Sequence, residues 1–401
     1  MENSLEEVFG RTGQGRNRDD VRQHNLSVLL QSVHLAGSVT RSQLTAHTGL
    51  NRSTISDLVS ELDLLGFAKE SETESKSAVG RPSLVVSASD DVLAIAVHPE
   101  YDFFNVGLVT LSGRVIKQVR SITPSDRSAK AMVQRISKVI GELQKELPKR
   151  SRIAGIGVAV PGQVRVSDGV VRLAPHLGWR EEPIAQMFTQ ATGLPTYIDN
   201  DASLGCLAER AFGAAQGYSD VVYVYAGSGG IGGGVIVGGK QLRGAAGYGG
   251  EFGHTRVSNI TTLDYSGFAG TLEAAVRRDD VLDALKMFSA TDEELEREIL
   301  THATPQVKKL LKKQISSLAI GLSNFINIFN PEAVVLGGFL ATLLKYDSEE
   351  LIAETKKLTI EASWERVVFL PGALGQNLLM FGAAERAFAP LIARPSEFRF
   401  R

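Results

Sequence analysis

Apolar residues near the start of the chain recur with the 3.6-residue period of amphipathic helices. The first set, at i, i+3, i+4 and i+7, comprises Leu26, Leu29, Leu30 and Val33. Thr40, with Gln43 three residues later, forms a capping box and predicts a second helix that ends near Thr48. Asn51 is a suitable N-cap for a third helix. The apolar positions of this third helix have the same spacing and are Ile55, Leu58, Val59 and Leu62.

The second and third predicted helices are separated by a tight turn at Gly49, which is the pattern of a helix-turn-helix. In that motif the polar start of the second helix of the pair reaches base edges in the major groove. Two short predicted strands, 67–71 and 83–87, would add a wing. The turn between them contains Gly80-Arg81-Pro82, and an extended arginine of this kind suits a narrow minor groove.

A three-helix module that binds another protein is the alternative interpretation of this region. Charge does not separate the two, because residues 1–90 contain nine Lys or Arg and twelve Asp or Glu. The pattern of helix caps and apolar faces favours DNA binding.

After about residue 90 short apolar strands alternate with helices, which predicts an α/β architecture. The predicted strands are 93–97, 105–109, 153–160, 195–198, 221–225 and 333–336. A long helix is predicted over 306–330. Polar and glycine-rich segments follow several strands, and ligands bind at that edge of such sheets. The glycine run 228–234 is the most marked of these segments, and Gly337-Gly338 is expected to end the last strand.

Amino-acid composition and charge exclude some classes of protein but do not identify the function. A chain of 401 residues is expected to form two or three domains. The formal net charge of −2 gives no indication of nucleic acid or membrane binding, and the single cysteine, Cys206, excludes an intramolecular disulfide. Residues 1–20 are polar and expected to be a disordered arm. The acidic N-terminus is no signal peptide and no long apolar run occurs, so a cytoplasmic location and no membrane contact are expected.

The stretch 244–273 concentrates the candidate ligand-binding chemistry. It begins with glycines and alanines, which let a ligand approach the backbone closely. Glu251, His254 and Glu273 then supply directed hydrogen bonds of the kind that a hydroxyl-rich small molecule needs. Alone, the stretch favours the simpler interpretation of a glycine-rich loop with a surface Glu and a hydrogen-bonded His, and only the rest of the chain reverses this.

Taken together, these segments resemble the ROK family, whose name abbreviates repressor, open reading frame and kinase. The resemblance extends from about Val21 to Ala389 and rests on motifs in a fixed order. These motifs are Arg22-Gln23-His24-Asn25, Thr40-Arg41-Ser42-Gln43-Leu44, Gly80-Arg81-Pro82, Val160-Pro161-Gly162, Asn200-Asp201-Ala202, Ser228 to Gly234, Glu251-Phe252-Gly253-His254 and Val334 to Gly338.

The resemblance implies a winged helix-turn-helix domain over 21–88, followed by a two-lobed actin-like (ribonuclease H-like) sugar-kinase fold. The first lobe would comprise 89–199 and 380–401, and the second 200–379. The resemblance also implies a homodimer or homotetramer that binds double-stranded operator DNA. The residues then expected to contact DNA are Arg22, Arg41, Ser42, Asn51, Arg52, Ser53, Thr54, Ser56 and Arg81.

Sugar contacts are implied at the positions that match the family's motifs. These positions are Gly162, Asn200, Asp201, Glu251, His254 and Glu273. In kinase members the aspartate corresponding to Asp201 is the general base. Here no catalytic residue is assigned and no cofactor is expected. The kinase phosphate loop Asp-Gly-Gly-Thr is replaced by His98-Pro99-Glu100-Tyr101, in which proline lacks an N–H and Glu100 repels phosphate.

Family members also hold a structural zinc through the histidine of Glu-x-Gly-His and three cysteines. The three cysteine positions are Asp264, Ser266 and Thr271 in this chain. His254 and Asp264 would supply at most two ligands where a tetrahedral site needs four, so no zinc is expected. Apolar packing of Leu263, Tyr265 and Phe268 is expected to hold the loop instead.

The resulting hypothesis is a transcriptional regulator, a repressor of carbohydrate metabolism genes, whose operator binding responds to a sugar or sugar phosphate. The main alternative is a sugar kinase with an accessory DNA-binding domain, which an ATP-consumption assay would separate from a repressor. A third interpretation is a regulator controlled by a protein partner. The retained polar set at Asn200, Asp201, Glu251 and His254 argues against that third interpretation.

Overall fold

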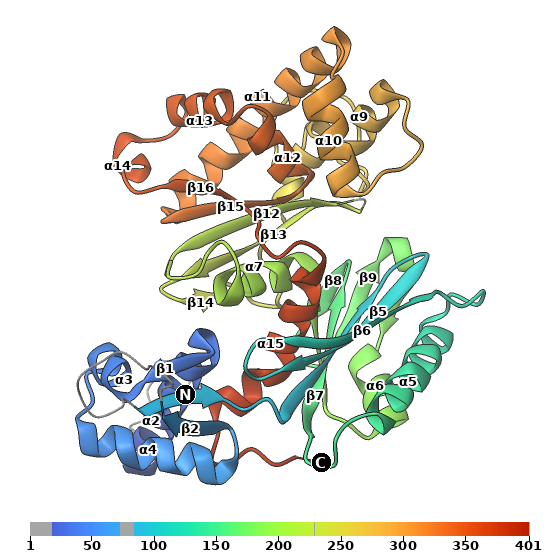
Figure 1. Cartoon of the computed structure of the whole chain (residues 1–401). Helices are drawn as coiled ribbons and strands as arrows, with labels where there is room; N and C mark the ends of the chain where they lie inside the picture. Colours follow the sequence, from blue (N-terminus) through green and yellow to red (C-terminus); the bar gives the residue numbers. More distant parts are fainter. Residues whose placement is uncertain (1–17, 73–83, 228, 401) are drawn as a thin grey trace, which may run out of the picture.

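The computed structural model describes residues 18–72, 84–227 and 229–400. A small N-terminal unit lies against one of two larger lobes, and the second lobe lies above the first (Figure 1). In the part of the chain that the structure describes, no helix is long and apolar enough to cross a membrane.

The described residues of the N-terminal unit, 18–72 and 84–88, form three helices and a small antiparallel sheet. The helices are α2 (Arg18–Ala36), α3 (Arg41–Thr48) and α4 (Arg52–Leu65). The strands β1 (Ser38–Thr40), β3 (Leu84–Ala88) and β2 (Ala68–Glu72) lie side by side in the order β1-β3-β2. The predicted capping box is present, because Thr40 and Gln43 bond reciprocally, and the Asn51 side chain accepts from the Thr54 amide. Gly49 ends α3 with φ 70°, a left-handed conformation that glycine adopts without steric cost.

The first lobe is built on a five-stranded sheet with the order β11-β7-β4-β5-β6. Its strands are β4 (Val92–Pro99), β5 (Phe103–Thr110), β6 (Val115–Ile122), β7 (Arg152–Val160) and β11 (Thr196–Asn200). A smaller sheet, in the order β10-β9-β8, comprises β8 (Gln163–Arg165), β9 (Val170–Ala174) and β10 (Trp179–Glu182), with the short helix η2 (Pro175–Leu177) before β10. Helices α5 (Ala129–Lys145) and α6 (Ile184–Thr192) pack on one face of the larger sheet, and α15 (Leu378–Ala393) packs on the other.

The second lobe has its own five-stranded sheet, in the order β14-β13-β12-β15-β16. Its strands are β12 (Val221–Gly227), β13 (Gly230–Val237), β14 (Lys240–Gln241), β15 (Ala333–Gly338) and β16 (Val368–Pro371). Helix α7 (Asp201–Phe212) covers one face, where Cys206 packs with Tyr223. The opposite face packs on the long helix α11 (Pro305–Phe329). The remaining elements of this lobe are η3 (Phe252–His254), α8 (Leu272–Ala275), α9 (Arg278–Leu285), α10 (Asp292–His302), α12 (Phe339–Tyr346), α13 (Ser348–Lys357), α14 (Glu361–Trp364) and η4 (Gly375–Asn377).

The N-terminal unit and the first lobe share one hydrophobic core. Buried side chains of α2 and α4, such as Leu30 and Leu58, belong to the same cluster as Ala383 and Phe388 of α15. Helix α15 lies close against the sheet, because a Cβ added at Gly157 of β7 would lie 1.7 Å from the Ala383 carbonyl oxygen. A shared core of this kind makes the small unit move with the first lobe as one body.

A buried histidine joins the N-terminal unit to α15. His34 of α2 donates from Nδ1 to the Leu111 carbonyl at 2.5 Å and from Nε2 to Glu385 at 2.7 Å. Burial lowers the pKa of His34, but the Glu385 carboxylate and the Leu111 carbonyl raise it more, so its pKa lies above the usual value. Both ring nitrogens face oxygen acceptors, so only the protonated ring satisfies them both.

A second link connects the first lobe to the end of helix α4. The Arg152 guanidinium donates to the carbonyl oxygens of Leu65 at 2.9 Å and Gly66 at 2.6 Å. A cation at this position complements the negative end of the helix dipole and satisfies carbonyls that have no partner within the helix.

Several predicted elements differ from those observed. Residues 18–20 were expected in a disordered arm but belong to α2, and residues 1–17 lie outside the described residues. The apolar pattern did not indicate β1, which has only 3 residues, or β6, whose residues alternate strictly between half-buried and exposed. Gly337-Gly338 was expected to end a strand, yet both glycines lie within β15, where they pair with Tyr225 and Ala226.

Candidate functional site

The sugar-site residues predicted near Asn200 lie together at the junction of the two lobes. Gly162 adopts φ 156° in the turn after β7, and its carbonyl oxygen accepts from Asn200 Nδ2 at 3.0 Å. The same amide group donates to Asp201 Oδ1 at 3.1 Å, and Asn200 Oδ1 accepts from the Ser203 amide at 2.9 Å as the N-cap of α7. The parallel neighbours β7 and β11 bring these residues together, because both strands end at the same edge of the sheet.

A hollow of about 300 Å³ opens beside this group. Its polar side chains are Gln163, Asn200, Ser203, Tyr248 and Glu251, and six glycines form much of its wall: Gly162, Gly232, Gly233, Gly247, Gly249 and Gly250. A hollow with exposed backbone and a few polar side chains suits a small hydroxyl-rich ligand. Sequence reasoning did not single out Gln163, Ser203 or Tyr248, because polar residues in loops carry no signal of their own.

Glu251 and His254 follow the glycine-rich segment and form one pair. His254 Nε2 lies 4.0 Å from Glu251 Oε2, and its Nδ1 donates to Asp264 Oδ2 at 2.9 Å. Burial raises the pKa of Glu251, with Glu273 adding to the shift and His254 opposing it. The carboxylate of Asp264 therefore fixes the imidazole, and the ring's other nitrogen is turned toward Glu251 at the edge of the hollow.

Asp264 holds the loop that was expected to be held by apolar packing. Its Oδ1 accepts from the amides of Ser266 at 3.0 Å and Phe268 at 2.8 Å, and its Oδ2 also accepts from the Thr271 hydroxyl at 2.9 Å. The expectation of packing was wrong, because Leu263, Tyr265 and Phe268 are each more than half exposed. Burial raises the pKa of Asp264, but these hydrogen bonds lower it more, so the net shift is downward.

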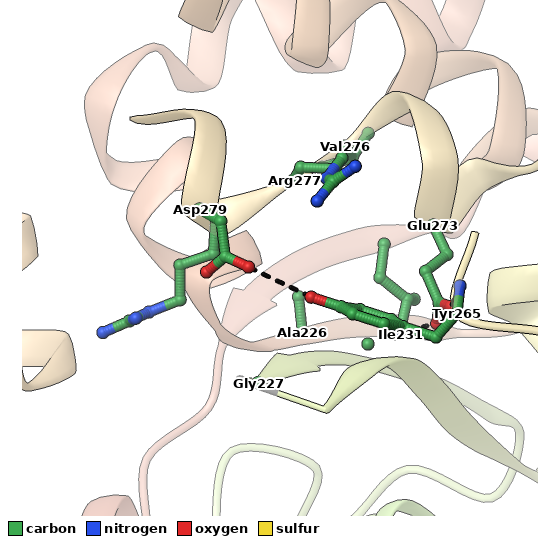
Figure 2. A pocket seen from close by; sticks show the side chains of 10 residues that line it. Ala226, Gly227, Ile231, Tyr265, Glu273, Val276, Arg277 and Asp279 are labelled. Carbon is green, nitrogen blue, oxygen red and sulfur yellow. Dashed lines mark hydrogen bonds between the residues drawn. The ribbon is translucent and has the colours of Figure 1, made fainter. Parts of the chain in front are cut away.

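Glu273 does not line the hollow beside Asn200, but its carboxylate lies within 4.8 Å of the candidate ligand atoms of His254 and Asp264. Its side chain is buried, and it accepts from the amides of Ile231 at 2.7 Å and Tyr265 at 3.2 Å. Glu273 lines a neighbouring hollow of about 280 Å³ on the second lobe, across which the Tyr265 hydroxyl donates to Asp279 at 3.0 Å (Figure 2). The sugar contact predicted for Glu273 stays a prediction, and in the structure its carboxylate binds these two backbone amides.

The zinc implied by the family resemblance does not fit the residues present. His254, Asp264 and Glu273 each bring one candidate ligand atom within 4.8 Å of the others, which is one carboxylate more than was expected from the sequence. However, Asp264 already accepts four hydrogen bonds and Glu273 two, and His254 Nδ1 donates to Asp264. Three candidate ligands whose lone pairs are engaged do not make the four-ligand site of a structural zinc. The absence of zinc stays a prediction.

A second cluster of titratable groups lies next to Asp201, at the turn that follows β4. His98 Nε2 lies 3.2 Å from Glu100 Oε1. Burial raises the pKa of Asp201 to about 6, with His98 opposing the shift and Glu100 adding to it. His176 of η2 faces the same turn, and it also spans the lobes: its ring contacts Tyr265 edge-on and its Nε2 donates to the Gly229 carbonyl at 3.3 Å. Sequence reasoning named His98 and Glu100 only as a departure from kinases and missed His176.

Some of the predicted DNA-contacting residues are exposed, and others form hydrogen bonds within the chain. Ser42, Arg52 and Ser53 are exposed at the starts of α3 and α4, although the Ser53 hydroxyl donates to the Asn51 cap at 2.7 Å. Thr54 is half-buried in the first turn of α4.

Three other members of that set take part in bonds within the chain. Arg41 donates to both carboxylate oxygens of Glu70 and to Ser56 Oγ, and Arg22 donates to Glu61 at 2.5 Å. Arg81 lies outside the described residues.

The sequence of this chain is similar to proteins of known family. The model of the ROK family matches residues 97–388. A putative xylose repressor of Caldicellulosiruptor sp. (strain Rt8B.4) is 27% identical over 391 residues, which cover 94% of this chain and 98% of the relative. A glucokinase of Thermotoga maritima is 30% identical over 255 residues, which cover 59% of this chain and 78% of the relative.

A solved structure shows the same fold. The crystal structure of a ROK family transcriptional regulator, a homologue of the E. coli Mlc protein, superposes with a TM-score of 0.76 at 20% identity. The match covers 93% of this chain and 97% of that one. The α/β two-lobed sugar-kinase fold expected from the sequence is therefore confirmed.

Proposed function

The chain belongs to the ROK family, and we propose that it is a transcriptional repressor whose operator binding is controlled by a sugar bound between its lobes. The observation that carries the proposal is the coexistence of two parts in one chain. A hollow lined by Asn200, Glu251 and glycines lies between the lobes, and a capped helix pair, α3 and α4, is fused through a shared core to the first lobe.

The DNA-binding part of the proposal rests on residues 21–88 as a winged helix-turn-helix. Helix α4 presents Arg52 at its exposed start, where a guanidinium can pair bidentately with guanine in the major groove. Arg41 is bonded to Glu70 and Ser56, which fixes the position of α3 relative to β2 and α4. We assign Arg52 and Thr54 to base recognition. Arg41 and Ser56 hold the motif together, and Arg22 and Ser42 are assigned to phosphates.

Control by a sugar follows from where the hollow lies. A ligand that contacts Gly162 on the first lobe and Glu251 on the second favours one angle between the lobes. Because the N-terminal unit shares its core with the first lobe, a change of that angle moves the N-terminal units of a homodimer or homotetramer relative to one another. Such a ligand shifts the population between two states to the extent that it binds one state better.

The division into domains belongs to the same proposal: 21–88 for DNA, 89–199 with 380–401 as the first lobe, and 200–379 as the second. Phosphoryl transfer is not part of it, because the turn after β4 carries Pro99 and Glu100 where a kinase needs phosphate-binding amides. A coupled ATP-consumption assay with a sugar panel tests this point, and sugar-dependent ATP consumption would establish a kinase.

The experiment for the repressor function starts with selection of binding sites from genomic DNA by the purified protein. An inverted repeat should be recovered, and a sugar should release the protein from it. Recovery of no preferred sequence would contradict the proposed DNA recognition. A preferred sequence from which no sugar releases the protein would contradict the proposed control.

A further inference from the structure

We infer that the cleft is selective for an uncharged sugar and rejects phosphorylated ligands, and that Glu100 is the residue chiefly responsible. The inference rests on the proposed function and narrows its ligand from a sugar or sugar phosphate to one of the two. It is carried by the partners of three sets of backbone amides: one in the turn whose Glu100 acts on Asp201, one that includes Ser203 of the hollow, and one at Ile231 of the neighbouring hollow.

The first set of amides lies in the turn after β4. Pro99 has no N–H, and the amide of Glu100 donates to the Phe103 carbonyl at 2.8 Å. The Glu100 side chain is itself held within this turn by His98 at 3.2 Å. A phosphate that approached this turn would therefore meet a carboxylate and no amide that is free to donate.

The second set lies at the start of helix α7, where free amides and the helix dipole ordinarily attract anions. Here the chain satisfies them itself. The amide of Ala202 donates to Asp201 Oδ1 at 2.8 Å, and the amide of Ser203 donates to Asn200 Oδ1 at 2.9 Å. The carboxylate of Asp201 further offsets the positive end of the dipole.

The third set lies in the glycine-rich hairpin between β12 and β13. The Ile231 amide donates to Glu273 Oε2 at 2.7 Å. The Glu273 carboxylate packs directly against the backbone of Gly230, because a Cβ added at Gly230 would lie 2.1 Å from the same oxygen. At this hairpin the buried carboxylate of Glu273 thus takes the place that a phosphate oxygen would need.

The charged side chains near the cleft also disfavour a phosphate. Glu100 adds to the field at Asp201, and the basic side chains that face the two acids are histidines, His98 and His176. No lysine or arginine is among the described residues that line the hollow beside Asn200. On the other side of Glu273, Arg277 and Arg278 line the neighbouring hollow, but they pair with Asp280 at 3.5 Å and Asp292 at 3.6 Å.

A neutral sugar meets none of these obstacles. Its hydroxyls can donate to Glu251 and bond with Asn200, while the glycine wall admits the ring. Sugar and sugar phosphate differ by about two negative charges, and like charges within about 4–6 Å disfavour each other strongly. The same cleft therefore accepts the first and rejects the second.

The test measures release of the selected operator by D-xylose, D-glucose and glucose 6-phosphate, with the full-length protein. A neutral sugar should release the wild-type protein, and glucose 6-phosphate should fail to do so at 100-fold higher concentration. In Glu100→Gln, which keeps the shape and removes the charge, the affinity for glucose 6-phosphate relative to the neutral sugar should rise at least tenfold. Glu100→Asp retains the charge and should keep the rejection, and Glu142→Gln, on the exposed face of α5, serves as the control for loss of a distant carboxylate.

Two results would overturn the inference while leaving the proposed function intact. One is release of the wild-type protein by glucose 6-phosphate as readily as by a neutral sugar. The other is an unchanged ratio of the two affinities in a folded Glu100→Gln protein. If no ligand released the operator, the proposed function itself would fail.

Discussion

Replacement of Asp264 by alanine tests whether hydrogen bonds hold the 264–271 loop. The change removes a carboxylate that accepts from the amides of Ser266 and Phe268, from the Thr271 hydroxyl and from the His254 imidazole. Because the pKa of Asp264 lies below its usual value, the carboxylate is ionised at pH 7 and its full contribution is present there. That contribution is lost only as pH falls through the lowered pKa.

The magnitude follows from which partners water can reach. Ser266 and Phe268 are exposed and His254 is partly so, so their donors can turn to water and each lost bond costs about 0.5–1 kcal/mol. Thr271 is only 3% exposed, and leaving its hydroxyl without a partner costs about 1–3 kcal/mol. The sum is about 2.5–6 kcal/mol, and its lower end corresponds to roughly a hundredfold faster local opening.

Amide hydrogen exchange of the purified protein measures this opening directly. Amides of the 264–271 loop should exchange about a hundredfold faster in Asp264→Ala, while those of β4 and β7 should not change. Phe268→Ala removes an exposed ring but keeps the bonded amide, so it should change exchange less than threefold. Equal acceleration in both variants would refute the hydrogen-bond explanation and favour apolar packing of the loop.

Three further perturbations have defined outcomes. His34→Gln should lower the unfolding temperature more at pH 5.5 than at pH 8.5, because the pKa of His34 is raised in the folded protein and its stabilising effect is therefore present below the usual pKa of about 6.5 and lost as pH rises through the folded pKa. A difference in unfolding temperature between wild type and variant that does not depend on pH would contradict a protonated His34. Sugar affinity should fall about fivefold from pH 7.5 to 5, because Asp201, with a pKa of about 6, becomes a weaker acceptor when protonated; Asp201→Asn should be flat over this range, and a fall as large as in the wild type would locate the titration elsewhere. Arg52→Ala should cost about 1–3 kcal/mol on the selected operator and less on random DNA, with Arg297→Ala as control; equal losses on both DNAs would exclude base recognition.

Local sequence signals predicted most of the elements that carry the site. The capping box at Thr40 and the cap at Asn51 are present because their determinants lie within three residues of each other. The α/β architecture was also readable, since buried strands such as β4 are continuous apolar runs, but β11 extends two residues beyond its predicted end at residue 198.

Contacts between distant segments could not be predicted in the same way. Nothing in the local sequence pattern indicates that Glu385 bonds to His34, because 351 residues separate them. Glu273 was placed among the sugar contacts because it matches the family's glutamate that closes the neighbouring loop, but its bond to the distant Ile231 amide could not be predicted. The role of Asp264 was missed for a related reason, because hydrogen bonds to backbone amides depend on the loop conformation and not on residue types.

The most direct test of a sugar-controlled repressor is a fluorescence anisotropy titration of the full-length protein on its selected operator, with and without D-xylose or D-glucose. Specific binding should weaken at least tenfold in the presence of one neutral sugar, and the change should be lost in Asn200→Ala, which removes contacts to Gly162 and Ser203 at the lobe junction. Operator affinity that is the same with every sugar tested would contradict control through the cleft.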